Sequence, residues 1–333
     1  MELEINTIMN KIVIANSYRC KNKQSFFAIH QIVNKIRSYK PDCKIDYHII
    51  WDTNPEGEVD NINWDEKINA IASDTVSIYS YDQTFFSNYA VKEYNIQPEL
   101  IAKFKKYPAI YFVLMAHYLR KIKQEECCLI YDDDIIINYD FHDIIDYIIN
   151  KQSILIVEIA NANCDKVLFT KLNELYSEEF IHIYKLRNPN LFGFNSGFQC
   201  IDLSLFDEFI NTDNFQLLLN IFDYSGIFDN EGKEIWGPNR FLIDTQQQSF
   251  FGIMNVVKSR ANPIILNPHQ YFVVPNWGVS PIHGPINIDN EFQGWDIALK
   301  SKITHFIGHT QGKGKPKIFL QLVDKYLEEN KLL

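Results

Sequence analysis

The 333-residue sequence lacks the features that would mark it for a membrane or for secretion. No stretch approaches the roughly 20 consecutive apolar residues of a membrane-spanning helix. The first ten residues, MELEINTIMN, do not combine a basic start with an apolar core, as a signal peptide would. Internal repeats and low-complexity tracts are also absent. We therefore expect a globular protein that has no membrane span and is not secreted.

Clustered positive charge and cysteine pairs with CxxC spacing are missing as well. The formal net charge is -10 and Lys and Arg form no long run, which argues against nucleic acid as a partner. The six cysteines show no CxxC spacing, and Cys127 and Cys128 lie side by side in a segment that we predict to be a buried strand. We interpret the cysteines as reduced apolar residues, which favours a cytoplasmic location.

Short apolar segments alternate with segments of helical spacing, a pattern that is typical of βαβ units. We expect strands at residues 11–15, 44–51, 76–81, 127–131, 153–160 and 194–203, and helices around residues 29–36, 108–123, 141–150, 204–220, 245–253 and 316–329. The turn-rich stretch 223–239 predicts a long surface loop. The predicted fold class is α/β, with a mainly parallel central sheet flanked by helices and a smaller antiparallel portion. Ligands of such sheets bind beyond the carboxyl ends of the strands.

The most informative feature is an apolar run, CCLIY at residues 127–131, that stops at Asp132, Asp133 and Asp134. If the strand continues, alternation makes the side chains of Asp132 and Asp134 point the same way. Two converging carboxylates repel each other in a poorly solvated crevice, and a hard divalent cation between them removes that repulsion. The plainer alternative is an acidic turn after a strand.

A second unusual segment, THFIGHTQGKGKP, begins at Thr304. Its strand-like start carries His305, and three glycines interleaved with two lysines follow. Glycines expose backbone N–H groups and lysines supply positive charge, which is the composition of a loop that wraps a phosphate. A buried structural histidine and a mobile surface loop are the alternatives. Together with a remote pair of carboxylates, His305 becomes a candidate third ligand, and the mixed set of oxygen and imidazole ligands suits Mn²⁺ or a similar ion.

Four motifs in order, LIYDDDIII, FGFNSGFQCID, IDTQQQSFF and HFIGHTQGKGKP, carry a resemblance to a known family. In order and spacing they resemble the nucleotide-sugar glycosyltransferases of family eight, which adopt the GT-A fold and include glycogenin-like and bacterial galactosyltransferases. The resemblance spans residues 11–316. It implies one GT-A domain over residues 1–333, with a nucleotide-binding half at about 11–160 and an acceptor-side half at about 161–333 that ends in a helix.

The resemblance also implies a reaction. The protein would be a hexosyltransferase that moves a hexose from a UDP-sugar to a hydroxyl group of a protein, a glycan or a small molecule, with retention of configuration. The metal site would be the Asp-x-Asp pair Asp132 and Asp134 together with His305. It would hold Mn²⁺, or Mg²⁺, against the diphosphate of the donor. Asp133 lies between the two ligands and is assigned to donor binding. A homodimer is left open.

Other donor contacts follow from the same resemblance. The first strand would bind the uridine through Ala15, Asn16, Ser17 and Tyr18, whose ring could stack on the base. Packing on the surface is the alternative for Tyr18. Asn195 would line the donor sugar.

Gly308 and a following lysine would complete the grip on the diphosphate. We favour Lys315, which precedes Pro316, and place Lys313 second. Near the anomeric carbon the family has a motif that aligns here in two registers, so that either Asp244 or Gln247 is the catalytic candidate.

Two other classes of protein share part of this pattern. Phosphatases of the haloacid dehalogenase type also end an apolar strand with Asp-x-Asp, but they expect Thr or Val where Ile136 stands and place the motif near the start of the chain. The other alternative is a catalytically weak GT-A-like protein that binds sugars. All three predicted metal ligands are present, so the sequence gives no sign that catalytic activity has been lost.

Overall fold

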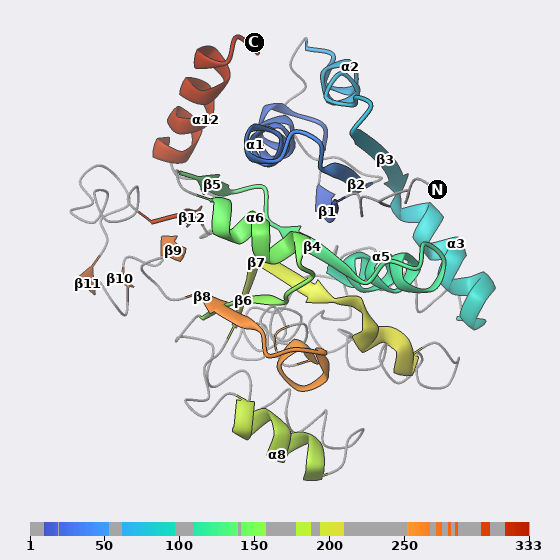
Figure 1. Cartoon of the computed structure of the whole chain (residues 1–333). Helices are drawn as coiled ribbons and strands as arrows, with labels where there is room; N and C mark the ends of the chain where they lie inside the picture. The colour runs from blue at the N-terminus through green and yellow to red at the C-terminus, as the bar shows by residue number, and fades with distance from the viewer. Residues whose placement is uncertain are drawn as a thin grey trace, which may run out of the picture.

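The structure is a computed structural model. Helices from the beginning and from the end of the chain lie side by side in it (Figure 1). It describes residues 10–18, 20–52, 62–96, 109–138, 141–157, 178–187, 194–209, 252, 254–266, 271–274, 279–280, 284–285, 301–306 and 317–332. The predicted loop 223–239 lies outside these residues, as do most of the predicted helices 204–220 and 245–253.

A seven-stranded sheet forms the centre of the molecule, in the order β3-β2-β1-β4-β7-β6-β8. Its strands are β1 (Lys11–Tyr18), β2 (Lys44–Trp51), β3 (Val76–Asp82), β4 (Cys127–Tyr131), β6 (Ile154–Val157), β7 (Phe194–Asp202) and β8 (Ile264–Leu266). Every neighbouring pair is parallel except the two that β7 makes with β4 and β6, so β7 alone runs against the other strands. The predicted α/β class with a mainly parallel central sheet is confirmed.

Two smaller sheets lie beside the central one. The first has the order β5-β12-β9, from β5 (Ile135–Ile137), β12 (Ile303–Phe306) and β9 (Tyr271–Val274). In it β12 is antiparallel to β5 and parallel to β9. The second pairs β10 (Val279–Ser280) with β11 (Gly284–Pro285) in antiparallel fashion. The first of these sheets forms one side of the site described below.

Helices surround the central sheet (Figure 1). They are α1 (Lys23–Tyr39), α2 (Trp64–Asn69), α3 (Gln83–Tyr94), α5 (Ala109–Lys121), α6 (His142–Ile149), α8 (Glu178–Arg187), α12 (Lys317–Glu329) and a 3-10 helix, η2 (Leu203–Phe209). In α1 the Asn22 side chain accepts a hydrogen bond from the N–H of Ser25, and the Ser25 side chain accepts one from the N–H of Asn22. This capping box fixes where the helix begins.

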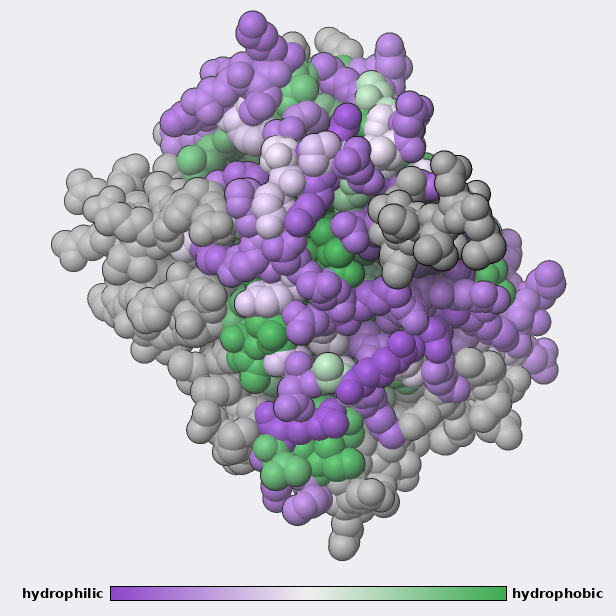
Figure 2. Space-filling view, in the orientation of Figure 1, coloured by the Kyte–Doolittle hydropathy of each residue, from purple (hydrophilic) through white to green (hydrophobic). Residues whose placement is uncertain are grey.

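Among the described residues, the core consists of two hydrophobic clusters, and β1 contributes to both. Ile12 and Ile14 pack into the cluster that includes the buried face of α1, whereas Val13 and Ala15 pack into the cluster that includes α5. Successive side chains of a strand point to opposite faces, so β1 is covered on both sides. On the viewed face, hydrophilic residues cover much of the described surface, with smaller hydrophobic patches between them (Figure 2).

The most consequential difference from the sequence prediction concerns the aspartate triplet. We expected the side chains of the triplet to alternate in direction as they do in a strand, but β4 ends at Tyr131 and Asp133 and Asp134 form a turn. The isoleucines that follow form β5, which belongs to a different sheet. The triplet is therefore the link between two sheets, and a turn rather than strand alternation decides where its side chains point.

Most other predicted elements are found within a few residues of their expected bounds. The sequence pattern missed the helices α2, α3 and α8 and the short strands β8, β9, β10 and β11. None of the five described cysteines forms a disulfide. No helix among the described residues is long and apolar enough to cross a membrane.

Candidate metal centre

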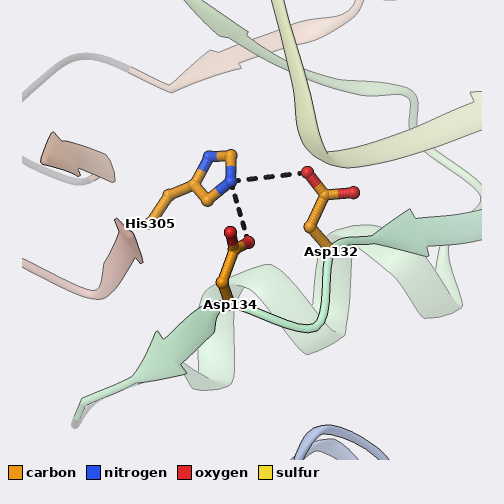
Figure 3. A group of neighbouring side chains, drawn as sticks. All are labelled: Asp132, Asp134 and His305. Carbon is orange, nitrogen blue, oxygen red and sulfur yellow. Dashed lines mark ion pairs between the residues drawn. The ribbon is translucent and has the colours of Figure 1, made fainter. Parts of the chain in front are cut away.

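Asp132, Asp134 and His305 converge at the point where the two sheets meet (Figure 3). Asp132 directly follows β4, Asp134 directly precedes β5, and His305 lies on β12. The pairing of β12 with β5 sets His305 opposite Ile135, the residue next to Asp134. Neighbours across an antiparallel pair lie close together, which explains how a residue from the end of the chain reaches the triplet.

The imidazole of His305 faces both carboxylates. Its Nε2 lies 3.1 Å from Oδ1 of Asp134 and 3.4 Å from Oδ2 of Asp132 (Figure 3). The side chains of His305 and Asp134 are 5% and 6% exposed, whereas that of Asp132 is 40% exposed. The cluster is thus closed on the side of β5 and β12 and open to solvent on the side of Asp132.

The two carboxylates change the proton affinity of His305. Burial is the largest single influence and lowers the pKa of the imidazole, but the attraction and hydrogen bonding of Asp134 and Asp132 together outweigh it. The pKa of His305 rises from 6.5 to about 10. Without a bound cation, the imidazole is therefore protonated at neutral pH and itself compensates part of the negative charge.

The three side chains fit a divalent cation. One ligand atom from each lies within 4.8 Å of the other two. Ligands bound at about 2.1 Å and at right angles to one another are about 3.0 Å apart, close to the separations seen around His305. Two carboxylate oxygens and one imidazole nitrogen suit Mn²⁺ or a similar first-row ion. A cation would displace the proton of His305, because a ligating imidazole nitrogen must be unprotonated.

Backbone hydrogen bonds fix the triplet to both sheets. The N–H of Asp132 donates to the carbonyl oxygen of Gly197 in β7 at 2.9 Å. The carbonyl oxygen of Asp134 accepts from the N–H of Phe306 in β12, also at 2.9 Å. One carboxylate is thereby attached to the central sheet and the other to the smaller sheet that carries His305.

The predicted uridine-binding segment forms the end of β1. The Asn16 amide nitrogen donates to the hydroxyls of Tyr18 and Tyr47 at 2.6 and 2.7 Å. The Tyr47 hydroxyl lies 2.7 Å from that of Tyr18 and 2.5 Å from that of Tyr131, and Asn16 Oδ1 accepts from the N–H of Tyr131 at 3.2 Å. Asn16 and Tyr18 are 0% and 3% exposed, so both side chains belong to a buried network.

This network corrects the alternative reading of Tyr18 as a surface residue. The predicted contacts of Ala15, Asn16, Ser17 and Tyr18 with the base stay a prediction. Ser17 is partly buried, whereas the other three residues are buried. Asp133 is likewise partly buried, between the two candidate ligands.

The remaining predicted site residues are not all within the described part of the chain. Asn195 lies in β7, where it is paired with Ile156, and its side chain is not described. Outside the described residues lie Asp244, Gln247, Gly308, Lys313 and Lys315. Their roles stay predictions.

A residue that the sequence reasoning missed is Gln31 of α1. Its side-chain nitrogen donates to the carbonyl oxygen of Ile135 at 2.6 Å, and its side-chain oxygen accepts from the N–H of Ile137 at 3.1 Å. Little in the sequence signals this role, because Gln31 lies on the face of α1 that carries Ala28 and Lys35 and not on the apolar stripe of Ile29, Ile32 and Val33.

Comparisons with known proteins place the chain in no family. No protein-family model matches it, and no curated protein matches its sequence. Among solved structures, it is similar to mouse xyloside xylosyltransferase 1, with 10% identity, a TM-score of 0.44 and coverage of 89% of this chain and 97% of that one.

Two further solved structures are similar to a comparable degree. The bifunctional glycosyltransferase WbbM has 12% identity and a TM-score of 0.45, with 100% of this chain and 53% of that one covered. The galactosyltransferase LgtC, solved with donor and acceptor sugar analogues, has 12% identity and a TM-score of 0.40, with 95% of each chain covered.

Proposed function

We propose that this protein is a metal-dependent glycosyltransferase that moves a hexose from a UDP-sugar to a hydroxyl acceptor with retention of configuration. The observation that carries the proposal is the convergence of Asp132, Asp134 and His305 at the junction of two sheets. These are the three residues that the resemblance to family-eight glycosyltransferases implies as metal ligands. The proposal includes a single GT-A domain over residues 1–333, Mn²⁺ in preference to Mg²⁺, and a cytoplasmic location.

The position of the cluster supports this function. Asp132 follows the carboxyl end of β4, and β1, parallel to β4, ends beside it at Tyr18. Small ligands of α/β sheets bind beyond the carboxyl ends of parallel strands. A nucleotide bound there would place its diphosphate on the exposed side of Asp132, where the cluster opens to solvent.

Transfer breaks the bond between the anomeric carbon and a diphosphate oxygen and forms a bond from that carbon to the acceptor oxygen. The leaving group gains negative charge while the sugar becomes oxocarbenium-like. A bound Mn²⁺ would supply positive charge to the diphosphate. Asp132, Asp134 and His305 would hold this charge in place, and the burial of Asp134 and His305 limits competition from water.

Asn195 of β7 and residues beyond the described part of the chain complete the proposal. Gly308 and Lys315, or Lys313, would bind the diphosphate, and Asn195 would bind hydroxyls of the donor sugar. Asp244 or Gln247 would orient the sugar or stabilise its positive charge. The acceptor proton would pass to the departing diphosphate oxygen, so neither residue has to be a strong base.

The test is a screen of UDP-hexoses for release of UDP that depends on Mn²⁺ and on an added sugar acceptor. Asp134→Asn keeps the size of the side chain but removes the charge of a buried ligand. We expect it to lower the rate at least 100-fold, because loss of one electrostatic contact to a developing charge has effects of about that size. Asp324→Asn is the matched control, since Asp324 is a 44% exposed carboxylate whose partner is Lys23. It should leave the rate unchanged.

Three results would contradict the proposal in different ways. Release of phosphate from a simple phosphate ester, with no UDP released from any UDP-hexose, would favour a phosphatase of the haloacid dehalogenase type. Tight binding of UDP-sugar without turnover with any acceptor would favour the sugar-binding protein. UDP release that Asp134→Asn leaves unchanged would refute the metal ligands.

A further inference from the structure

Three polar side chains on α1 follow the edge of β5 that faces away from β12. Gln24, Gln31 and Lys35 are spaced by seven and four residues, so they lie on one face of the helix. Gln24 donates to the carbonyl oxygen of Asp133 at 3.4 Å, and Lys35 donates to that of Asn138 at 3.0 Å. Between them Gln31 makes the two bonds to β5 described above. This face of α1 thus accompanies the chain from the triplet to the end of β5.

Gln31 takes the place of a neighbouring strand. The carbonyl oxygen of Ile135 and the N–H of Ile137 are two residues apart and therefore point to the same edge of β5. A side-chain amide offers one donor and one acceptor, as a peptide group does. Gln31 is 2% exposed, and Ile135 and Ile137 are 0% and 5% exposed, so water cannot readily replace it. Without Gln31, two buried backbone groups would lose their partner, which is costly.

The position of β5 determines the geometry of the metal centre. Asp134 directly precedes β5, and His305 is opposite Ile135 on the paired strand. Asp132 is instead attached to the central sheet through Gly197. A shift of β5 relative to that sheet would therefore move Asp134 and His305 together, away from Asp132. Whatever fixes β5 against α1 also fixes the spacing of the three ligand atoms.

We propose that Gln31 is a positioning residue of the metal centre, acting on Asp134 and His305 through β5. This inference rests on the metal site of the proposed function and on no other part of it. Asn16 makes a similar contact before the triplet. Its Oδ1 accepts a hydrogen bond from the N–H of Tyr131, the residue before Asp132. Side-chain amides thus hold the backbone immediately before and shortly after the three aspartates.

The experiment measures Mn²⁺ affinity of the full chain by electron paramagnetic resonance, with no nucleotide or sugar present. Gln31→Met nearly preserves the length and volume of the side chain and removes the amide. We expect the dissociation constant for Mn²⁺ to rise 10- to 100-fold, the usual effect of losing a group that orients metal ligands. Gln31→Glu keeps an acceptor for the N–H of Ile137 but loses the donor to Ile135, and its affinity should lie between those of Gln31→Met and the wild type.

Asn255→Leu is the matched control. Asn255 is also a buried amide, 0% exposed, that accepts from the Ser153 hydroxyl and from the N–H of Asp202. Asp202 is paired with Cys127, at the opposite end of β4 from Asp132. This variant should lower the temperature of unfolding while the Mn²⁺ affinity stays within about twofold of the wild type, since the hydrogen bonds and packing that change lie far from the site.

The outcomes separate this inference from the proposed function. Unchanged affinity in Gln31→Met, or an equal loss in Asn255→Leu, would overturn the role of Gln31. If Gln31→Met does not fold, the same criteria apply to Gln31→Glu. Wild-type protein that binds Mn²⁺ and depends on Gln31 but transfers no sugar would refute the proposed function alone. Wild-type protein that binds no Mn²⁺ would refute the metal centre and this inference with it.

Discussion

At the scale of single residues, His305 would link proton binding to the proposed metal binding. Its pKa of about 10 lies above the usual 6.5 because Asp134 and Asp132 favour the charged form. A group whose pKa is raised on folding stabilises the fold fully below its unfolded pKa, and this contribution is lost as the pH rises through the folded pKa. In the metal-free protein that loss extends from about pH 6.5 to about pH 10.

The first prediction concerns the pH dependence of Mn²⁺ binding. The ion has to displace the proton of His305, so the affinity should rise about tenfold per pH unit between about pH 6.5 and 8.5, with about one proton released per ion. Isothermal titration calorimetry in buffers of different ionisation enthalpy measures both quantities. His305→Gln should bind Mn²⁺ more weakly and release no proton. Proton release that persists in this variant would contradict the assignment.

The sequence pointed to the three side chains that the structure brings together, but not to the residues that support them. Asp132, Asp134 and His305 are charged or titratable residues at the ends of apolar segments, so their chemistry is visible in the sequence. Gln31 acts through bonds to backbone groups more than 100 residues away, at sequence separations of 104 and 106. Its helical spacing shows which face of α1 it occupies, but nothing local identifies the partner. Contacts of this kind depend on tertiary structure alone.

At the scale of elements, α12 holds the strand that carries His305. Phe319 of α12 lies with its ring centre 5.4 Å from that of Phe306, the residue after His305, and 6.3 Å from that of Phe27 in α1. Tyr326, two turns further along, lies 5.1 Å from Phe27. The helix therefore bridges β12 and α1, the two elements that enclose β5.

The second prediction compares two neighbouring residues of α12. Phe319 is fully buried, and Phe319→Ala should lower the free energy of unfolding by about 3–5 kcal/mol because it leaves a cavity between β12 and α1. Leu320 is 42% exposed, and Leu320→Ala should change that free energy by at most about 0.5 kcal/mol. Urea denaturation followed by circular dichroism measures both. Equal losses in the two variants would show that α12 is not docked as described.

Element bounds were predictable where apolar periodicity and polar boundaries agree. The β2 prediction matches the structure at both ends, from Lys44 to Trp51. The β4–β5 region was harder, because apolar residues flank the triplet on both sides and the pattern resembles one continuous strand. Helix α3 was missed although Asp82 caps it, accepting from the N–H of Phe85. Its aromatic and polar residues are too evenly mixed to give a clear apolar stripe.

At the scale of the whole molecule, the proposed cation would join two sheets that otherwise meet through side chains and a short turn. One ligand belongs to the central sheet, through the bond of Asp132 to Gly197, and the others belong to the smaller sheet. Binding to the folded state alone stabilises that state in proportion to the logarithm of ligand concentration over the dissociation constant.

The third prediction is a metal-dependent shift in thermal unfolding. Mn²⁺ at a hundredfold excess over its dissociation constant should add about 2.7 kcal/mol to the free energy of unfolding. Differential scanning fluorimetry should then show a midpoint a few degrees higher, reversed by EDTA. Asp134→Asn should show no shift, whereas Asp324→Asn should respond as the wild type does. A shift of equal size in all three proteins would indicate binding elsewhere.

The assembly of the site from both ends of the chain has a consequence for synthesis. β1, β2 and β4, together with Asp132 and Asp134, leave the ribosome long before β12 does. Until β12 pairs with β5, the nascent chain offers two acidic groups and no imidazole, which is an incomplete and weaker binding site for a transition metal. Capture of the ion should therefore mark the completion of folding, and a ribosome-bound chain stalled before residue 303 should fail to retain Mn²⁺.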